Sequence, residues 1–206
     1  DGHHTGFASF SATLSPIAGS DTAKGTVTVV VKGNALFLTG KGENLAAGLV
    51  DGAGGCDPSG TNSSCGVHIH SGTGCADSTA QGGHFFQSAT DPWALVGYST
   101  TSATGTATFD AALVGTVDTT KIPNKPVVVH DKTGARVACG VLKRNADHVH
   151  GTYGGELSAY GAGSKVSGHV AIAVVDDRLF LTGDAKDLEK SLVDGAGGCD
   201  PSGTNN

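Results

Sequence analysis

Two histidines separated by one residue, His68 and His70, are the side chains of this sequence best suited to chemistry. They stand in the run Gly66-Val67-His68-Ile69-His70. A β-strand points alternate side chains to opposite faces, so both imidazoles are expected on one face, with Val67 and Ile69 on the other. Two imidazoles held a few ångströms apart on one sheet face form half of a metal site.

Two further histidines stand in contexts that fit the same site. His84 lies in Gly-Gly-His-Phe-Phe, and His130 follows the run Lys-Pro-Val-Val-Val. A set of four imidazoles without a thiolate favours copper, with zinc or nickel next. The sequence therefore predicts a copper site formed by His68, His70, His84 and His130.

The elements that position these histidines are expected to be short strands. The 206 residues include 33 glycines and no methionine, and charged residues make up 16%. Alternating segments bounded by turn residues predict seven or eight strands in an antiparallel sandwich or barrel. The expected strands are residues 7–14, 25–32, 35–42, 66–70, 104–113, 126–131 and 137–142, with 94–98 as a further candidate.

Charge and hydropathy limit the partners. The net charge of −6 argues against nucleic acid or an anionic membrane as the main partner. No apolar run approaches the ~20 residues that span a bilayer. No signal peptide is recognisable, so we expect a mature or processed form.

The sequence repeats itself. Residues 49–62 (LVDGAGGCDPSGTN) are identical to residues 192–205, so residue n matches residue n + 143. A complete repeat is expected over 1–152 and a partial second repeat, with the first three strands only, over 153–206. The second copy stops before its Gly-Val-His-Ile-His, which predicts a tandem-repeat protein seen in part. The partial repeat is expected to pack on the first, on another molecule, or on more of a longer chain.

Five cysteines occur without any Cys-x-x-Cys spacing, namely Cys56, Cys65, Cys75, Cys139 and Cys199. We expect disulfides formed in an oxidising compartment, and hence an extracellular or cell-surface location. Four cysteines alone permit three pairings. Asn62, in Asn-Ser-Ser, is a candidate glycosylation site.

Four segments of the first repeat occur in a characteristic order: Val67-His68-Ile69-His70, Gly82-Gly83-His84, Val128-Val129-His130 and Arg136-Val137-Ala138-Cys139-Gly140-Val141. In these segments and their order the first repeat resembles the copper-zinc superoxide dismutase family. The partial repeat is similar to the family's first three strands only. The resemblance implies an eight-stranded Greek-key β-barrel with copper on its outer face.

The resemblance also implies roles for individual residues. The four histidines would be copper ligands, and Arg136 would flank the substrate channel and attract superoxide. Cys75 with Cys139 would pin the active-site loop to the barrel, which leaves Cys56 to pair with Cys65. Arg136 and His84 would then be the catalytic residues.

The chain departs from the zinc-containing members of the family. Residues 85–98 contain no histidine, and Asp91 is the only candidate carboxylate there. One ligand does not make a zinc site, so zinc is expected to be absent and the chain resembles the copper-only branch. Without zinc the second nitrogen of His84 needs another partner, for which Asp91 is the candidate.

Three functions follow as hypotheses. The first is an extracellular copper-only superoxide dismutase-like repeat protein that converts superoxide to oxygen and hydrogen peroxide. The alternative is a structural subunit of an extracellular filament or sheath, with copper incidental and self-association through the partial repeat. The third is a copper store or carrier, in which Arg136 would be dispensable.

The remaining histidines and aromatic residues have plainer interpretations. Histidines at the repeat edges could form a second metal site at a domain junction, but solvated linker positions are the preferred interpretation. They are His3, His4, His148 and His150. His169 is expected on the surface, and Trp93 with Phe85 and Phe86 is expected to serve packing.

Overall fold

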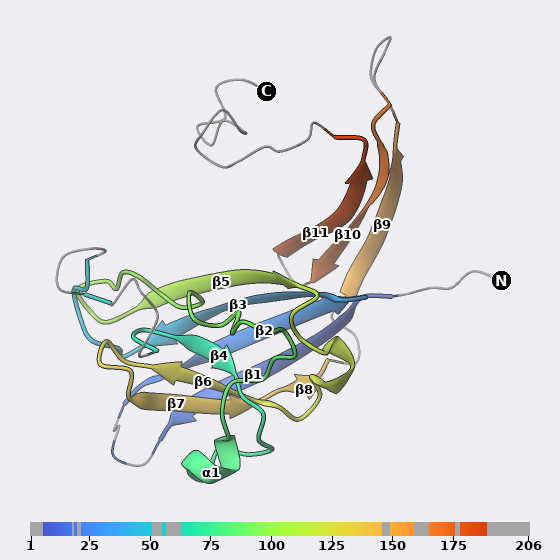
Figure 1. The fold of residues 1–206 in the computed structure, drawn as a ribbon. Helices are drawn as coiled ribbons and strands as arrows, with labels where there is room; N and C mark the ends of the chain where they lie inside the picture. The colour runs from blue at the N-terminus through green and yellow to red at the C-terminus, as the bar shows by residue number, and fades with distance from the viewer. Residues whose placement is uncertain are drawn as a thin grey trace.

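The computed structural model describes residues 6–17, 19, 22–50, 55–56, 63–145, 149–158, 165–175 and 178–188. Its strands form an eight-stranded sheet, which curls into a nearly closed barrel, and a separate three-stranded sheet (Figure 1). Every pairing within both sheets is antiparallel. The expected all-β antiparallel barrel is therefore confirmed.

The barrel sheet has the strand order β4-β6-β7-β1-β2-β3-β5, with short β8 paired to β1. Helical structure within the described residues is limited to α1 (Ser78–Gln81) and a 3₁₀ turn (Thr119–Lys121). The barrel strands are β1 (Ala8–Pro16), β2 (Lys24–Lys32), β3 (Ala35–Glu43), β4 (Val67–Ile69), β5 (Ala107–Val114), β6 (Pro126–His130), β7 (Arg136–Val141) and β8 (Lys143–Arg144).

The connections follow a Greek-key pattern. Strands β1, β2 and β3 form a meander, and the chain then crosses from β3 to β4 at the far end of the strand order. It returns to β5 beside β3 and crosses once more to β6 beside β4. These two crossings bring the His-x-His strand next to the Val-Val-His strand.

The predicted strand at residues 94–98 is wrong. Residues 92–95 form a turn, closed by a 2.9 Å hydrogen bond from the Val96 N–H to the Trp93 carbonyl. What remains is an isolated bridge between Gly97 and Gly66. This bridge lies beside β4, on the side where β4 and β5 leave the barrel open. No longer strand forms there because residues 92–95 are in the turn.

Alternation along the strands builds the barrel interior. In β2, Val27 and Val29 are buried inside, while the Thr26 and Thr28 side chains alternate with them. Val30 breaks this pattern: it points to the outer face and is nevertheless fully buried. It is covered by the three-stranded sheet.

The second sheet consists of β9 (Val149–Leu157), β10 (Ser167–Val175) and β11 (Arg178–Lys186). It lies against the outside of the barrel, where Phe37 and Phe180 are in ring contact at 5.8 Å and Arg178 donates a 2.7 Å hydrogen bond to the Thr39 hydroxyl. β10 and β11 fall within the segment expected to form the partial repeat, and β9 begins before it. The repeat boundary expected after residue 152 falls inside β9.

Several sequence predictions concern residues outside the described ranges, namely His3, His4, Asn62, His148, Cys199 and the side chain of His150. His169 is exposed on β10, as expected. Within the described residues, no helix has the length and apolar character needed to cross a membrane.

Candidate metal centre

Strand pairing places the histidines. β4 runs antiparallel to β6, with His68 opposite Val128, and the alternate residues Val67 and Ile69 are fully buried in the core. His70, just after β4, forms an isolated bridge with His84. The expected alternation along this strand is therefore confirmed.

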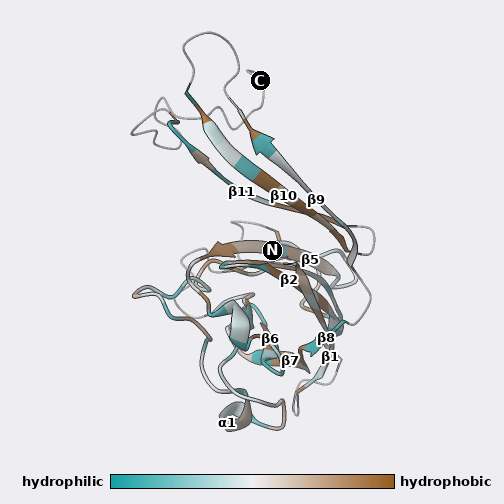
Figure 2. Ribbon diagram, turned by 90° about the vertical axis from the view of Figure 1, so that its right-hand side faces the viewer, coloured by the Kyte–Doolittle hydropathy of each residue, from teal (hydrophilic) through white to brown (hydrophobic). Residues whose placement is uncertain are grey.

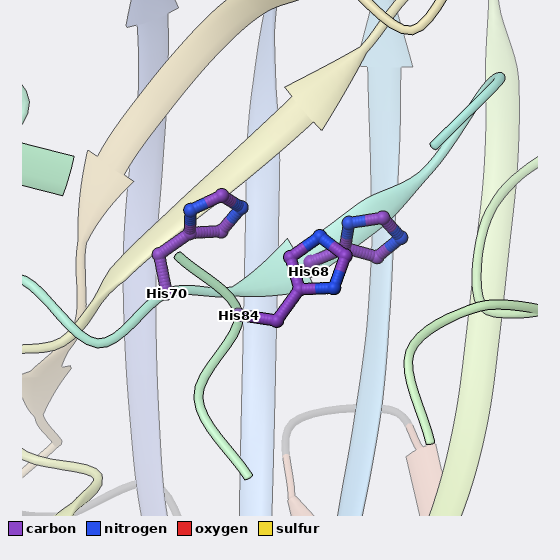
Figure 3. A group of neighbouring side chains, drawn as sticks. All are labelled: His68, His70 and His84. Carbon is purple, nitrogen blue, oxygen red and sulfur yellow. The ribbon is translucent and has the colours of Figure 1, made fainter. Parts of the chain in front are cut away.

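Three of the four predicted ligands converge. His68, His70 and His84 each offer one ring nitrogen, and these three nitrogens lie within 4.8 Å of one another. Figure 3 shows His68 and His70 beside β4, with His84 reaching toward them from its own loop. Three nitrogens at this spacing can hold one metal ion.

The fourth histidine, His130, borders this group. Its ring centroid lies 4.9 Å from that of His68 and 5.7 Å from that of His70. The separation from His84 is 6.4 Å, which is the longest of the four-histidine set. His130 therefore lies beside the three converging histidines without belonging to the group whose nitrogens lie within 4.8 Å.

Two buried nitrogens of the cluster have no hydrogen-bond partner, the His68 Nδ1 and the His70 Nε2. Buried polar atoms nearly always have a hydrogen-bond partner, so two buried nitrogens without one indicate a site for a ligand such as a metal ion. The other nitrogen of His70, Nδ1, lies 2.9 Å from the Gly82 carbonyl oxygen, which can only accept. His70 therefore carries its proton on Nδ1 and leaves an Nε2 lone pair for a metal.

Asp91 fixes the orientation of His84. Its Oδ2 lies 2.6 Å from the His84 Nδ1, and its Oδ1 accepts a 2.9 Å hydrogen bond from the Trp93 N–H. The carboxylate holds the proton on Nδ1, so Nε2 of His84 is free to bind a metal. Asp91 is thus the partner that the sequence suggested for this histidine.

Burial keeps three of the four histidines neutral. Burial lowers the pKa of His68 to about 2, and neighbouring His130 adds to the effect. Burial likewise lowers the pKa of His70 to about 4 and that of His130 to about 3. Neutral imidazole is the form that binds metals, so these rings are ready to coordinate at neutral pH.

Arg136, at the start of β7, lies beside the cluster. Its guanidinium donates hydrogen bonds to the Gln81 side chain at 2.8 Å and to the Gly82 carbonyl at 2.9 Å. Partial burial lowers the pKa of Arg136, yet a guanidinium stays charged at neutral pH. The structure thus places a fixed positive charge next to His70.

Two disulfides hold the surrounding loops. Cys75 is bonded to Cys139 on β7, and Cys56 is bonded to Cys65 immediately before β4. These are the pairs that the family resemblance implied. Disulfides are typical of proteins that fold in an oxidising compartment rather than the cytosol.

Three supporting residues were not predicted from the sequence. Gln81 is 1% exposed and binds Arg136, and Gly82 supplies the carbonyl shared by Arg136 and His70. The Tyr98 hydroxyl donates a 2.8 Å hydrogen bond to the backbone carbonyl of His130. Only Gly82 left a signal, because it belongs to the Gly-Gly-His segment, whereas no pattern marks the other two.

Of the aromatic residues near the centre, Trp93 and Phe85 serve packing, as expected, whereas Phe86 is exposed. Trp93 is fully buried and donates a 2.8 Å hydrogen bond from Nε1 to the Phe85 carbonyl. Trp93 thus contacts the chain next to His84, through the Phe85 carbonyl, and also contacts Asp91, through its own backbone N–H.

No protein-family model matches this chain, and a search of curated proteins finds no match either. The geometry of the site therefore defines the chemistry that it can support. That geometry is a set of three converging imidazoles, with a fourth nearby, a carboxylate behind one ligand and a guanidinium beside another.

Proposed function

We propose that this chain is an extracellular copper-only superoxide dismutase-like repeat protein, which converts superoxide to oxygen and hydrogen peroxide. The observation that carries the proposal is the convergence of three imidazole nitrogens within 4.8 Å, in a cluster that also contains two buried ring nitrogens without a hydrogen-bond partner. The order of the sequence segments and the antiparallel barrel agree with this class of enzyme. The two disulfides support an extracellular location.

The donor set favours copper. All the candidate ligands are imidazoles, which suit both oxidation states of copper, and no thiolate lies among them. Bound copper would supply one-electron chemistry in both directions, taking an electron from one superoxide and giving one to a second, which with two protons becomes hydrogen peroxide.

The protein residues would prepare this chemistry. Asp91 holds the His84 proton on Nδ1, and the Gly82 carbonyl holds the His70 proton on Nδ1. Both rings then present Nε2 in a set orientation before any metal arrives. This preorganisation lowers the cost of ordering the ligands.

Arg136 would attract and orient the anion. The chain has a net charge of −6, which opposes long-range attraction of superoxide. Salt screens exposed charges beyond about 8 Å, so the local charge of Arg136 dominates close to the centre. Its two hydrogen bonds to Gln81 and Gly82 keep the guanidinium in place.

The test is copper titration of the purified chain, followed by electron paramagnetic resonance and by stopped-flow decay of superoxide. We expect one tightly held copper with a nitrogen-rich spectrum, and superoxide decay well above that of buffer. His84→Gln should lose both, whereas His169→Gln, an exposed residue of β10 outside the cluster, should keep both. Full copper occupancy with decay no faster than buffer would refute the enzymatic proposal.

A structural role is the second candidate, and one observation favours it. The two repeats pack through their outer sheet faces, where Phe37 meets Phe180, its equivalent at n + 143. A surface of this kind could join repeats into a filament or sheath. Electron microscopy at high protein concentration would show filaments if this role holds and dispersed particles if it does not.

A further inference from the structure

The three-stranded sheet repeats the register of the first three barrel strands. Tyr153 pairs with Ile172, which pairs with Leu181. At the positions 143 residues earlier, Phe10 pairs with Val29, which pairs with Leu38. β9, β10 and β11 are therefore the counterpart of β1, β2 and β3, strand for strand.

One face of this sheet covers the outside of the barrel. Ala171, Ala173, Val175 and Phe180 are buried there against Phe7, Val30 and Phe37. The contact joins equivalent surfaces, because Ala173 corresponds to Val30 and Phe180 to Phe37. In the first repeat this surface is the outside of the barrel, so the opposite face of the second sheet corresponds to a barrel interior.

We call that opposite face the open face. Its large apolar side chains are Tyr153, Leu157, Val170, Ile172, Val174, Leu179 and Leu181. Four of them are strongly exposed: Tyr153 at 64%, Leu157 at 42%, Leu179 at 63% and Leu181 at 55%. Strand pairing brings no charged residue to this face among the paired positions of β9, β10 and β11. Figure 2 shows the apolar stretch of β10 within this sheet.

The equivalent residues of the first repeat are all in the core. The counterparts of Tyr153, Leu179 and Leu181 are Phe10 at 3%, Leu36 at 0% and Leu38 at 1% exposed. A contiguous apolar surface of this kind, on a face whose counterpart is fully covered, marks a binding surface. What covers the counterpart is the other half of the barrel, whose inner residues include Val67, Ile69, Val127 and Val129.

We propose that the open face is the unfilled half of a second barrel and binds a half-barrel of the β4–β6–β7 kind. The occupant is a polypeptide with the sequence pattern of residues 63–145, and its apolar inner face would cover the seven residues of the open face. The open face and the inner face of such a half-barrel are both apolar and carry no charged residue, so they can pack together as the two halves of the first barrel do.

The sheet edges point to the same occupant. In the first repeat β3 pairs with β5 and β1 pairs with β7, whereas β11 and β9 have no further partner strand among the described residues. A half-barrel supplies strands to both edges while it covers the face. A second open face, packed against the first, would cover the apolar residues but leave both edges unpaired.

The direct test extends the whole chain. A copy of residues 63–145 is appended after residue 205, which continues the repeat in register because residue 206 corresponds to residue 63. We expect binding of a hydrophobic dye, strong in the original chain, to fall to the background level. Amide exchange in β11, followed by mass spectrometry, should slow about tenfold or more as this edge gains a partner.

A matched pair of substitutions tests the face within the extended chain. Ile172→Asp, whose counterpart Val29 is 0% exposed, should abolish the slowed exchange and restore dye binding. Thr152→Asp, on the opposite face and exposed, should change neither. Unchanged dye binding and unchanged exchange after extension would overturn the proposal.

The original chain provides a test that does not depend on the extension folding. Leu181→Asp should reduce dye binding and leave the melting temperature of the first barrel unchanged, because the face is uncovered. A loss of melting temperature, or a stable dimer in sedimentation that this substitution dissociates, would mean that a second copy covers the face. Either result would overturn the assignment of a half-barrel partner.

Discussion

His70 and Arg136 donate hydrogen bonds to the same acceptor, the carbonyl oxygen of Gly82, each at 2.9 Å. A candidate metal ligand and the charge proposed to guide the substrate are thus held by one backbone atom. The carbonyl can only accept, so it also fixes the proton of His70 on Nδ1. The position of the guanidinium and the tautomer of the ligand are therefore coupled.

Gly82→Ala should disturb both groups at once. Gly82 has φ of +73°, and an added Cβ would lie 2.7 Å from the Ser71 Oγ and 2.9 Å from the Gly72 nitrogen. We expect a loss of about 1–3 kcal/mol in the free energy of unfolding, measured by urea denaturation, together with weaker copper binding. Gly83→Ala is the control, since no atom lies within 4 Å of its Cβ position. Equal effects of the two substitutions would contradict the shared role of Gly82.

Arg136→Ala should slow superoxide decay and spare copper binding. Removal of the local charge takes away attraction of the anion, which is worth about tenfold or more in rate at low salt. The remaining activity should depend less on ionic strength, and Arg136→Lys should restore part of the rate. Arg144→Ala removes an exposed arginine on β8 and serves as the control. Full activity in Arg136→Ala would favour a copper store or carrier.

Asp91→Asn should weaken metal binding through His84. The neutral amide no longer polarises the Nδ1 proton, and loss of such a carboxylate typically costs about 10–100-fold in metal affinity. Competition with a chelator of known affinity would measure the change. Asp110→Asn, on an exposed residue of β5, should leave the affinity unaltered. If Asp91→Asn binds the metal as tightly as the original chain, Asp91 does not contribute to metal binding.

The metal-free protein should lose stability as the pH falls below about 6.5. His68, His70 and His130 have folded pKa values of about 2, 4 and 3, against 6.5 in the unfolded chain. Between pH 6.5 and about 4 the unfolded state binds protons that the folded state does not, so acid favours unfolding. Each such proton is worth about 1.4 kcal/mol per pH unit.

Urea denaturation across this pH range would measure that loss. Bound metal competes with protons at the same nitrogens, so copper should move the loss to lower pH. His70→Gln should make the slope shallower, because it removes one of the three buried imidazoles. A metal-free stability that stays flat from pH 7 to pH 4 would contradict the neutral, buried cluster.

Loss of the Cys75–Cys139 disulfide should cost more stability than loss of Cys56–Cys65. The first closes a sequence separation of 64 residues and the second a separation of 9. In the chain-entropy account these loops correspond to about 4 and about 3 kcal/mol. Cys-to-Ser double substitutions with thermal denaturation would compare them. The first pair should also loosen Gln81 and Arg136, and so reduce superoxide decay, because it ties β7 to the loop before α1.

Local patterns in the sequence predicted the local parts of this structure. The alternation around His68 and His70 indicated one strand with both rings on one face, and the paired strands β2 and β3 followed from their alternating residues. The 143-residue repeat indicated three further strands, which the structure contains in the same register. Side-chain alternation within a strand is set by the backbone alone, so a short segment carries this information.

The sequence by itself thus determined which histidines are candidate metal ligands, most of the segments that form strands, and the 143-residue repeat that relates β9, β10 and β11 to β1, β2 and β3. Only the tertiary structure decided that His84 and Asp91 share a 2.6 Å contact, that Gly82 serves both His70 and Arg136, and that the repeats meet through Phe37 and Phe180. It also showed that residues 94–98 form a turn and one bridge rather than a strand. The physical reason is that such contacts join segments whose approach depends on how the whole barrel closes and which faces pack, and no local periodicity records that choice.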